Sequence, residues 1–355
     1  MIIDDMIGRP VGWLGAGKSS GPVISSRIRL ARNLRDYAFP GWAGEEECES
    51  IWQQLRFPLQ AAPGLKDSYA VGMADMDPLD RQILFERHLI SREQAGKGRG
   101  SGLVGDPEER VAVMVNEEDH LRMQVIRPGL DLGAAWSVMD TLDDAIGKEV
   151  PYAFSSRLGY LTACPSNVGT GLRASAMLHT PGLVLMDEMT PVIKGITKIG
   201  LAVRGLWGEG TEAVGHMFQI SNQVTLGDKE ADIIHSLEQI VLEVVEHEQN
   251  ARARLMAQRD AVLLDYVGRA KGILENARVL SSKEALEWLS ALRLGLDMGI
   301  LSCVDRRSLD ELLVTTQPAH LQKREGRKLK AKDRDQARAQ RVRQVLIEVG
   351  LRYGK

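Results

Sequence analysis

The pattern of apolar residues changes along this chain and divides it into two unlike parts. In the first part, alternating or continuous apolar segments predict strands, for example VAVMV at 111–115. Beyond about residue 255 these segments end, and leucine-rich patterns with helical spacing run through 261–301. We therefore expect an α+β domain over residues 1–255, with an antiparallel sheet flanked by helices, and an all-helical domain over residues 256–355.

One predicted strand carries arginines on a single face. Residues 23–33 read VISSRIRLARN, so apolar side chains alternate with Arg27 and Arg29. Two arginines on one strand face repel each other unless an anion lies between them. VAVMV continues into the acidic cluster NEEDH at 116–120, and a second alternating segment follows it, which predicts a hairpin with the cluster at its turn. Further strands are expected at 152–162, 183–188, 196–204 and 222–226, and a long amphipathic helix from Asp228.

The composition is that of an ordinary globular protein. The 355 residues have a net charge of −3, which gives no general attraction to nucleic acid. Cys48, Cys164 and Cys303 form no CxxC pair, so neither a disulfide framework nor a zinc site is indicated. The N-terminal residues lack the apolar core of a signal peptide, and no uncharged apolar run is long enough to span a membrane. We expect a cytoplasmic protein without membrane contact.

Residues 12–19, GWLGAGKS, match the phosphate-loop pattern GxxxxGK[ST]. That loop binds phosphate only where a strand precedes it and a helix follows it. Pro10 lies just upstream, no strand-like segment precedes the loop, and Gly21-Pro22 blocks a helix downstream. We therefore interpret this segment as a connector.

Arginines recur beside glycines, serines and acids in four short motifs. Phosphoryl transfer requires mainly charge neutralisation and positioning, and an arginine fork binds phosphate oxygens in pairs. Any one of these arginines alone would be interpreted as a surface residue in an ion pair, but together they predict a cage for a nucleoside triphosphate. They are Arg27 and Arg29 in SSRIR, Arg122 in NEEDHLR, Arg173 in CPSNVGTGLR and Arg204 in RGLWGEG.

The acidic residues suit a guanidinium acceptor. Its pKa of roughly 12.5–13.8 means that removing a proton at pH 7 costs about 7.5 kcal/mol even at the lower value. A site that phosphorylates a guanidinium therefore needs carboxylates that hold it and accept its proton. Glu117, Glu118 and Asp119 form one such cluster, and Glu209 lies in a second. A Mg²⁺ or transition-metal site in EEDH is the alternative, although nothing at metal-ligand spacing supports it.

These four motifs, in this order, resemble those of the phosphagen kinases, a family that includes creatine and arginine kinases. Other segments are similar to the bacterial protein-arginine kinases: SSRIRLARNLRDY-x-FP at 25–40, FQISNQVTLG at 218–227, QPAHLQK at 317–323 and RDQARA at 334–339. The resemblance covers nearly the whole chain and is weakest over 41–110 and 260–310. It implies a glutamine-synthetase-like antiparallel sheet and ATP-dependent phosphorylation of arginine in proteins.

The resemblance also implies roles for particular residues. Glu118 corresponds to the catalytic base, Glu209 to its partner on the guanidinium, and Cys164 to a reactive cysteine beside the site. Trp207 stands where this branch often has tyrosine. ATP would bring its Mg²⁺, so no dedicated protein metal site is expected. The implied nucleotide contacts are Ser25, Ser26, Arg27, Ile28, Arg29, His88, Arg122, Arg173, Ala174, Ser175, Ala176, Met177, Arg204, Gly205, Leu206, Trp207, Gly208 and Glu209.

The segment from Lys323 to Arg343 carries ten Lys and Arg against three acids. A solvated helix face and a DNA-binding surface are two interpretations. In RDQARA, moreover, two arginines four positions apart suit a phosphate, and the acid between them suits a guanidinium. The resemblance implies a regulatory phosphoarginine site, with the residues Arg334, Asp335, Gln336, Ala337, Arg338 and Ala339.

The choice of acceptor and partners is less constrained. Only 24 residues precede Ser25, where small-molecule phosphagen kinases have a helical domain that closes over the free guanidine, so we expect a site open to protein arginines. A kinase of free arginine or another small guanidine, and a non-catalytic adaptor for phosphoarginine or DNA, are the alternatives. The resemblance implies a homodimer, a zinc-finger activator, and substrates that include a heat-shock repressor and proteins marked for Clp proteolysis.

Overall fold

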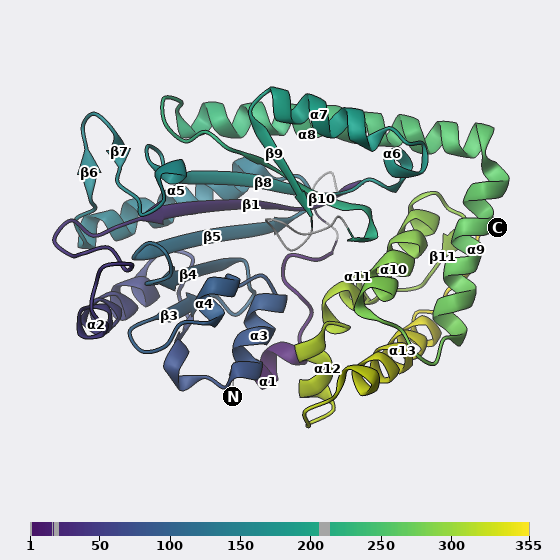
Figure 1. Ribbon diagram of the computed structural model, residues 1–355, viewed down its shortest axis with the longest axis horizontal. Coiled ribbons are helices and arrows are strands. Elements are labelled where there is room, and N and C mark those ends of the chain that lie inside the picture. The colour runs from purple at the N-terminus through teal and green to yellow at the C-terminus, as the bar shows by residue number, and fades with distance from the viewer. Residues whose placement is uncertain (1, 16, 18–20, 206–213, 355) are drawn as a thin grey trace.

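An eight-stranded antiparallel sheet forms the centre of the molecule (Figure 1). The computed structural model describes residues 2–15, 17, 21–205 and 214–354. The strand order is β2-β3-β4-β5-β1-β8-β10-β9, which puts β1 in the middle, between β5 and β8. The strands are β1 Val23–Arg32, β2 Tyr69–Gly72, β3 Gly102–Gly105, β4 Val111–Val115, β5 Leu121–Pro128, β8 Leu172–His179, β9 Leu201–Gly205 and β10 Met217–Asn222.

Three long helices cover one face of this sheet and form the main core: α2 Glu45–Ala61, α5 Leu132–Glu149 and α8 Glu230–Gln258. Ile28 and Leu30 of β1 point into this core and are fully buried, which stabilises the fold by about 1.5–3 kcal/mol per side chain. The remaining elements before the C-terminal region are α1 Ile2–Ile7, α3 Pro78–Glu86, α4 Arg92–Ala95, α6 Pro181–Leu185, α7 Met189–Lys198, the hairpin β6 Phe154–Ser155 and β7 Gly159–Tyr160, and the 3-10 turns η1 Met73–Asp75, η2 Pro165–Asn167 and η3 Val214–His216.

The C-terminal region is helical, and its core continues into the sheet domain. Trp13 of the N-terminal segment and Met177 of β8 pack in the same apolar cluster as the leucines of these helices. The region contains α9 Asp260–Asn276, α10 Ser282–Asp297, α11 Arg306–Thr315, α12 Pro318–Arg324 and α13 Ala331–Glu348. Our expectation of an all-helical domain needs one correction, because β11 Leu301–Ser302 and β12 Arg352–Tyr353 pair as a short ladder.

The α+β sheet domain followed by helices is confirmed, as are the strand at 23–33, the hairpin of β4 and β5, and the long helix that follows Asp228. The predicted strand at 183–188 is wrong: Pro181 begins helix α6 there, since a short buried apolar run can form either structure. The segment 196–204 starts inside α7 and is a strand only from Leu201. Helix α8 passes the expected domain boundary and ends at Gln258. None of the helices in the described ranges is long and apolar enough to cross a membrane.

The predicted strand at 222–226 is also displaced, because β10 ends at Asn222 and the following residues form a loop. The loop is held by hydrogen bonds to its side chains rather than by a strand ladder. Thr225 Oγ1 donates to the carbonyl oxygens of Ser166 and Val168, at 3.0 and 2.7 Å. The predicted strand at 152–162 is two short strands, β6 and β7, joined as a hairpin.

Candidate active site

Strand register brings the predicted arginines to one face of the sheet. Arg29 on β1 lies opposite Arg173 on β8, and Arg122 on β5 lies two residues from the position opposite Arg29. Because side chains alternate between faces, residues two apart along a strand share a face. Strands β10 and β9 extend this pairing toward the edge of the sheet, with Arg204 on β9 opposite Gln219 on β10. The face opposite the α5–α8 core therefore carries Arg27, Arg29, Arg122, Arg173 and Arg204.

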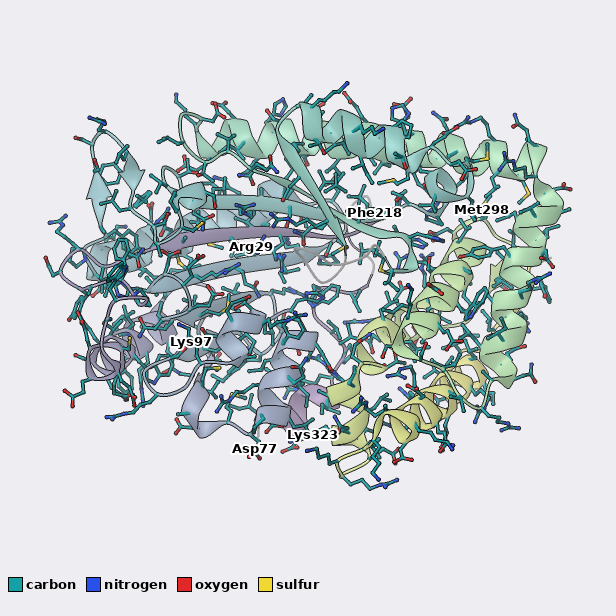
Figure 2. The ribbon with its side chains drawn as sticks, viewed as in Figure 1. Arg29, Asp77, Lys97, Phe218, Met298 and Lys323 are labelled. Carbon is teal, nitrogen blue, oxygen red and sulfur yellow. The ribbon has the colours of Figure 1, made fainter. Side chains whose placement is uncertain are left out.

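These five arginines line a cleft of about 960 Å³. Figure 2 shows Arg29 on the sheet and Lys97 on the segment after α4, and both residues line the cleft. Other lining side chains come from strands β5 and β10, from the turn after β4, from the end of α3 through α4, and from the loops before β8 and after β10. They include His88, Ser91, Glu93, Glu117, Glu118, Gln124, Cys164, Asn167, Gln219 and Gln223.

The arginine side of the cleft is strongly electropositive. Burial, together with the charges of the other four arginines, lowers the pKa of Arg29 well below its ordinary value. Burial and the Arg122 charge lower the pKa of Arg27 to about 10. The Arg29 Nε atom is buried and has no hydrogen-bond partner among the described residues. Guanidinium groups gathered in this way require an anion between them, and a polyphosphate has the matching charge and oxygen spacing.

Polar side chains hold the individual forks in place. Arg27 donates from Nη2 to Oε1 of Gln219 at 3.0 Å. Arg173 donates to the carbonyl oxygen of Asn222 at 3.3 Å and to Oδ1 of Asn167 at 3.4 Å. These neutral partners orient the guanidinium groups of Arg27 and Arg173 along the cleft wall.

Most of the acidic cluster is committed to structure. Asn116 adopts a left-handed conformation (φ 55°) and donates to the carbonyl oxygens of Cys48 and Gly100, which fixes the turn. Oδ1 of Asp119 accepts from the Asn33 amide at 2.6 Å and from a backbone N–H at 2.7 Å. His120 accepts at Nδ1 from the backbone N–H of residue 34 and contacts a carbonyl oxygen through Nε2, so both of its ring nitrogens are used.

Glu117 is buried and paired with Arg122. Nη1 of Arg122 donates to both carboxylate oxygens at 2.8 Å, and Ser91 Oγ donates to Oε1 at 2.5 Å. Burial alone would raise the pKa of Glu117, but the Arg122 charge and these hydrogen bonds outweigh it and lower that pKa. Glu117 therefore holds Arg122 at the edge of the cleft and stays ionised.

Glu118 is the member of the cluster whose carboxylate is exposed to the cleft. Partial burial, followed by the neighbouring charges of Asp119 and Glu117, raises its pKa above the ordinary value. A raised pKa brings a carboxylate nearer the operating pH, where a general base is most effective. Among the described side chains of the cluster, Glu118 is the one placed to take a proton from a bound acceptor.

The like-charge effect of Asp119 on Glu118 predicts a pH shift. Asp119→Asn keeps the acceptor oxygen that binds Asn33 but removes a negative charge, so the pKa of Glu118 should fall. Because the base works only when ionised, the acid limb of kcat/KM should then move to lower pH. Profiles of wild type, Asp119→Asn and Asp144→Asn, an exposed control on α5, measure this; an acid limb that stays in place or moves upward contradicts it.

The implied nucleotide contacts divide between two faces. Ser25, His88, Ser175 and Met177 line a small cavity of about 20 Å³ that shares Arg27, His88 and Gln219 with the arginine cleft. The alternate side chains point into the core on the other face; these are Ser26, Ile28, Ala174 and Ala176. Gly205 ends β9 beside Arg204. Leu206, Trp207, Gly208 and Glu209 lie outside the described residues.

Cys164 lies on the cleft wall in the loop before β8, half-buried, with its Sγ 3.0 Å from the Ser166 hydroxyl. Several lining residues were not predicted to belong to the site. Gln219 belongs to the segment FQISNQVTLG, whose alternation places it beside Arg27, and this was the available signal for it. Ser91 and Glu93 had no such signal, because only the folded α3–α4 corner brings them to the cleft.

The phosphate-loop pattern at 12–19 has the wrong neighbours for that role. Helix α1 precedes it and strand β1 follows it, the reverse of the order that a phosphate loop needs. Lys18 lies outside the described residues. Separately, no group of three or more His, Cys, Asp or Glu side chains among the described residues is arranged to hold a metal ion.

The RDQARA residues occupy the first turns of α13. Arg338 is buried, with 1% of its surface exposed, and donates from Nε to the Thr316 carbonyl at 2.9 Å and from Nη1 to that of Leu280 at 2.7 Å. Its Nη1 also pairs with Asp335 at 2.5 Å. Arg334 is half-buried and donates to the carbonyl of Leu329 at 3.2 Å. Arg338 therefore joins α13 to the end of α11 and to the loop before α10.

Two families match adjacent parts of the chain. Residues 57–251 match the family described as ATP:guanido phosphotransferase, C-terminal catalytic domain, and residues 260–352 match the protein-arginine kinase McsB C-terminal domain. The chain is 46% identical over 341 residues to the protein-arginine kinase of Moorella thermoacetica, covering 94% of this chain and 97% of that one. To the protein-arginine kinase of Bacillus subtilis it is 44% identical over 332 residues, covering 93% and 91%.

Solved structures of similar fold agree with these matches. The duplicated taurocyamine kinase of Schistosoma mansoni, with bound components of a transition-state analogue, superposes with a TM-score of 0.60 at 27% identity over 69% of this chain and 35% of that chain. A lombricine kinase superposes with a TM-score of 0.58 at 25% identity, covering 70% of this chain and 71% of the other.

Proposed function

Because the chain belongs to the ATP:guanido phosphotransferase family, within its protein-arginine kinase branch, we propose that it transfers the terminal phosphoryl group of ATP to arginine side chains of other proteins. The observation that carries the reaction class is one surface: five arginines share a sheet face, and the uncommitted carboxylate of Glu118 stands at its edge. The similarity to protein-arginine kinases supports the choice of acceptor.

The residues divide the chemical work. The arginines neutralise the phosphates and hold the γ-phosphoryl group in line with the acceptor. Glu118 takes a proton from the guanidinium nitrogen as that nitrogen bonds to phosphorus, and the bond from phosphorus to the bridging oxygen breaks, which releases ADP. Glu209 is proposed to hold the other side of the guanidinium. Mg²⁺ would be carried by the nucleotide phosphates, where it would neutralise charge, because the cleft offers it arginines and few free carboxylates.

The decisive experiment is mass spectrometry of a protein incubated with MgATP under neutral conditions, which preserve the acid-labile nitrogen–phosphorus bond. Phosphate on arginine side chains supports the proposal. Parallel assays with free arginine separate the acceptors: turnover of free arginine with no protein phosphorylation would favour the small-guanidine alternative. No phosphorylation of either acceptor, with phosphoarginine binding intact, would favour the adaptor.

We also propose that Arg334, Asp335 and the neighbouring α13 residues bind phosphoarginine and regulate the kinase. The burial of Arg338 determines how this is tested. Arg338→Ala would leave the buried carbonyls of Thr316 and Leu280 without their donor, at a cost of roughly 1–3 kcal/mol each. A loss of binding in that variant would therefore not distinguish lost recognition from a loosened domain.

Arg334→Ala is the better test, since Arg334 is half-buried and makes one backbone hydrogen bond. We expect it to weaken binding of free phosphoarginine at least tenfold, about the value of one charge-assisted contact, with little change in melting temperature. Calorimetry on wild type, Arg334→Ala and Arg327→Ala, an exposed arginine of the same basic segment, measures this. Equal affinities in all three would return the segment to a solvated basic helix face.

The remaining proposals concern the cellular setting. A cytoplasmic location, a homodimer, a zinc-finger activator, and substrates that include a heat-shock repressor and proteins destined for Clp proteolysis are consistent with an arginine kinase of this branch. Co-purification from cells and size measurement in solution test the partners and the dimer.

A further inference from the structure

Three consecutive residues at the end of α3 connect separate parts of the molecule. The first, Glu86, reaches into the helical domain at the start of α12. Its carboxylate accepts from the backbone N–H groups of Ala319 and His320 at 2.8 and 3.1 Å, and Oε2 lies 2.8 Å from Nδ1 of His320. Glu86 and His320 are 2% and 3% exposed, so this contact is shielded from solvent. Figure 1 shows α12 beside α3.

The second residue, Arg87, is fully buried and ties the corner to the N-terminal segment. Its side chain pairs with Glu109 at 2.6 Å and donates to the carbonyl oxygen of Arg9 at 3.3 Å. Its own carbonyl accepts the indole N–H of Trp13 at 3.0 Å. The corner is therefore held from the sheet, from the N-terminal segment and, through Glu86, from the helical domain.

The third residue, His88, lies at the arginine cleft. Its φ of 59° is unusual for a residue with a side chain, and such backbone strain persists only where surrounding contacts enforce it. Its carbonyl accepts from Nε2 of Gln124 at 2.6 Å, and its ring packs edge-on against Trp13 with centroids 4.9 Å apart. His88 lines both the arginine cleft and the smaller cavity that continues from it, whose other walls include Trp13, Ile126 and Met177.

We propose that Trp13 and the Glu86–His320 pair are positioning residues for the nucleotide, holding the ring of His88 at the junction of the two cavities. The inference rests on the proposed function for the identity of the ligand: with phosphates among the arginines, the nucleoside extends toward His88 and the apolar wall beside it. The helical domain thus sets nucleotide affinity through three consecutive residues, Glu86, Arg87 and His88.

The test is the affinity for ADP, measured by calorimetry on the full chain without any acceptor. His320→Ala and Trp13→Phe should each weaken ADP binding about tenfold, which is the effect of displacing one hydrogen bond. Each variant should also raise the KM for ATP, while kcat and the KM for the protein substrate stay near their wild-type values. His320→Asn keeps a donor near the Nδ1 position and should retain most of the affinity. His235→Ala, an exposed histidine on α8, is the control.

Melting temperatures taken alongside separate positioning from unfolding. Variants that stay folded but bind ADP like wild type overturn the inference, and so does His320→Asn if it behaves like His320→Ala. If His320→Ala does not fold, Trp13→Phe, which retains an aromatic side chain but loses the indole N–H, decides alone. A wild-type protein that binds ADP but phosphorylates no arginine would refute the proposed function while leaving this inference standing; a wild type that does not bind ADP would overturn both.

Discussion

Glu118→Gln is expected to lower turnover by about 10²–10⁴-fold while leaving nucleotide affinity close to wild type, because the change removes a general base and no phosphate contact. Glutamine keeps the shape of the side chain but cannot take a proton. The effect is large because of the acceptor: removing a proton from a guanidinium at pH 7 costs roughly 7.5 kcal/mol of free energy. Steady-state phosphorylation of a protein substrate and calorimetry with ADP measure the two quantities separately.

Glu93→Gln provides the matched control, since Glu93 is a second exposed carboxylate on the wall of the same cleft. It should retain turnover, because Glu93 lies on α4 and outside the turn that presents Glu118. If the two variants lose activity equally, the effect is the general charge of the cleft. Near wild-type turnover in Glu118→Gln would remove Glu118 from the role of base.

The arginine face was predictable from the sequence because strand alternation is a local property. Once β1, β5 and β8 are recognised as strands, the alternation that exposes Arg27 also exposes Arg29, and the resemblance to phosphagen kinases adds their neighbours on other strands. The same rule explains why, within each run of consecutive residues predicted to contact the nucleotide, only every second side chain points into the cleft. Ile28 and Ala176 were predicted as contacts through position in a motif, and both point into the core.

Contacts between distant segments were not predictable. Trp13 lies inside a pattern that resembles a phosphate loop, yet its indole reaches the carbonyl of Arg87, 74 residues away. His320 meets Glu86 across 234 positions, and no periodicity in either segment indicates this pairing. From the four-residue spacing, Arg338 was expected to share a phosphate-binding helix face with Arg334. The helix presents that position to Thr316 and Leu280, whose free carbonyls attract its fork into the interior.

Arg29→Met should abolish productive ATP use and yet leave the nucleotide-free protein as stable as wild type or more stable. Burial and four neighbouring positive charges lower the pKa of Arg29, so its charged form is less favourable in the folded protein than in the unfolded chain. Methionine removes that penalty and keeps most of the side-chain volume. Without nucleotide, the melting temperature should therefore stay level or rise.

With nucleotide the sign reverses. Losing a guanidinium fork removes charge-assisted hydrogen bonds of about 1.5–3 kcal/mol each, so ADP affinity should fall roughly 100-fold and the rise in melting temperature on adding ADP should largely disappear. Arg127→Met is the control, because Arg127 lies on β5 with its side chain on the opposite face, paired with Asp131. Unchanged ADP affinity in Arg29→Met would remove this strand face from the nucleotide site. A lower melting temperature with affinity retained would instead make Arg29 a structural residue. A binding site differs from a structural ion-pair network in that its charged cluster destabilises the empty protein and is neutralised by the ligand. This pair of measurements separates the two.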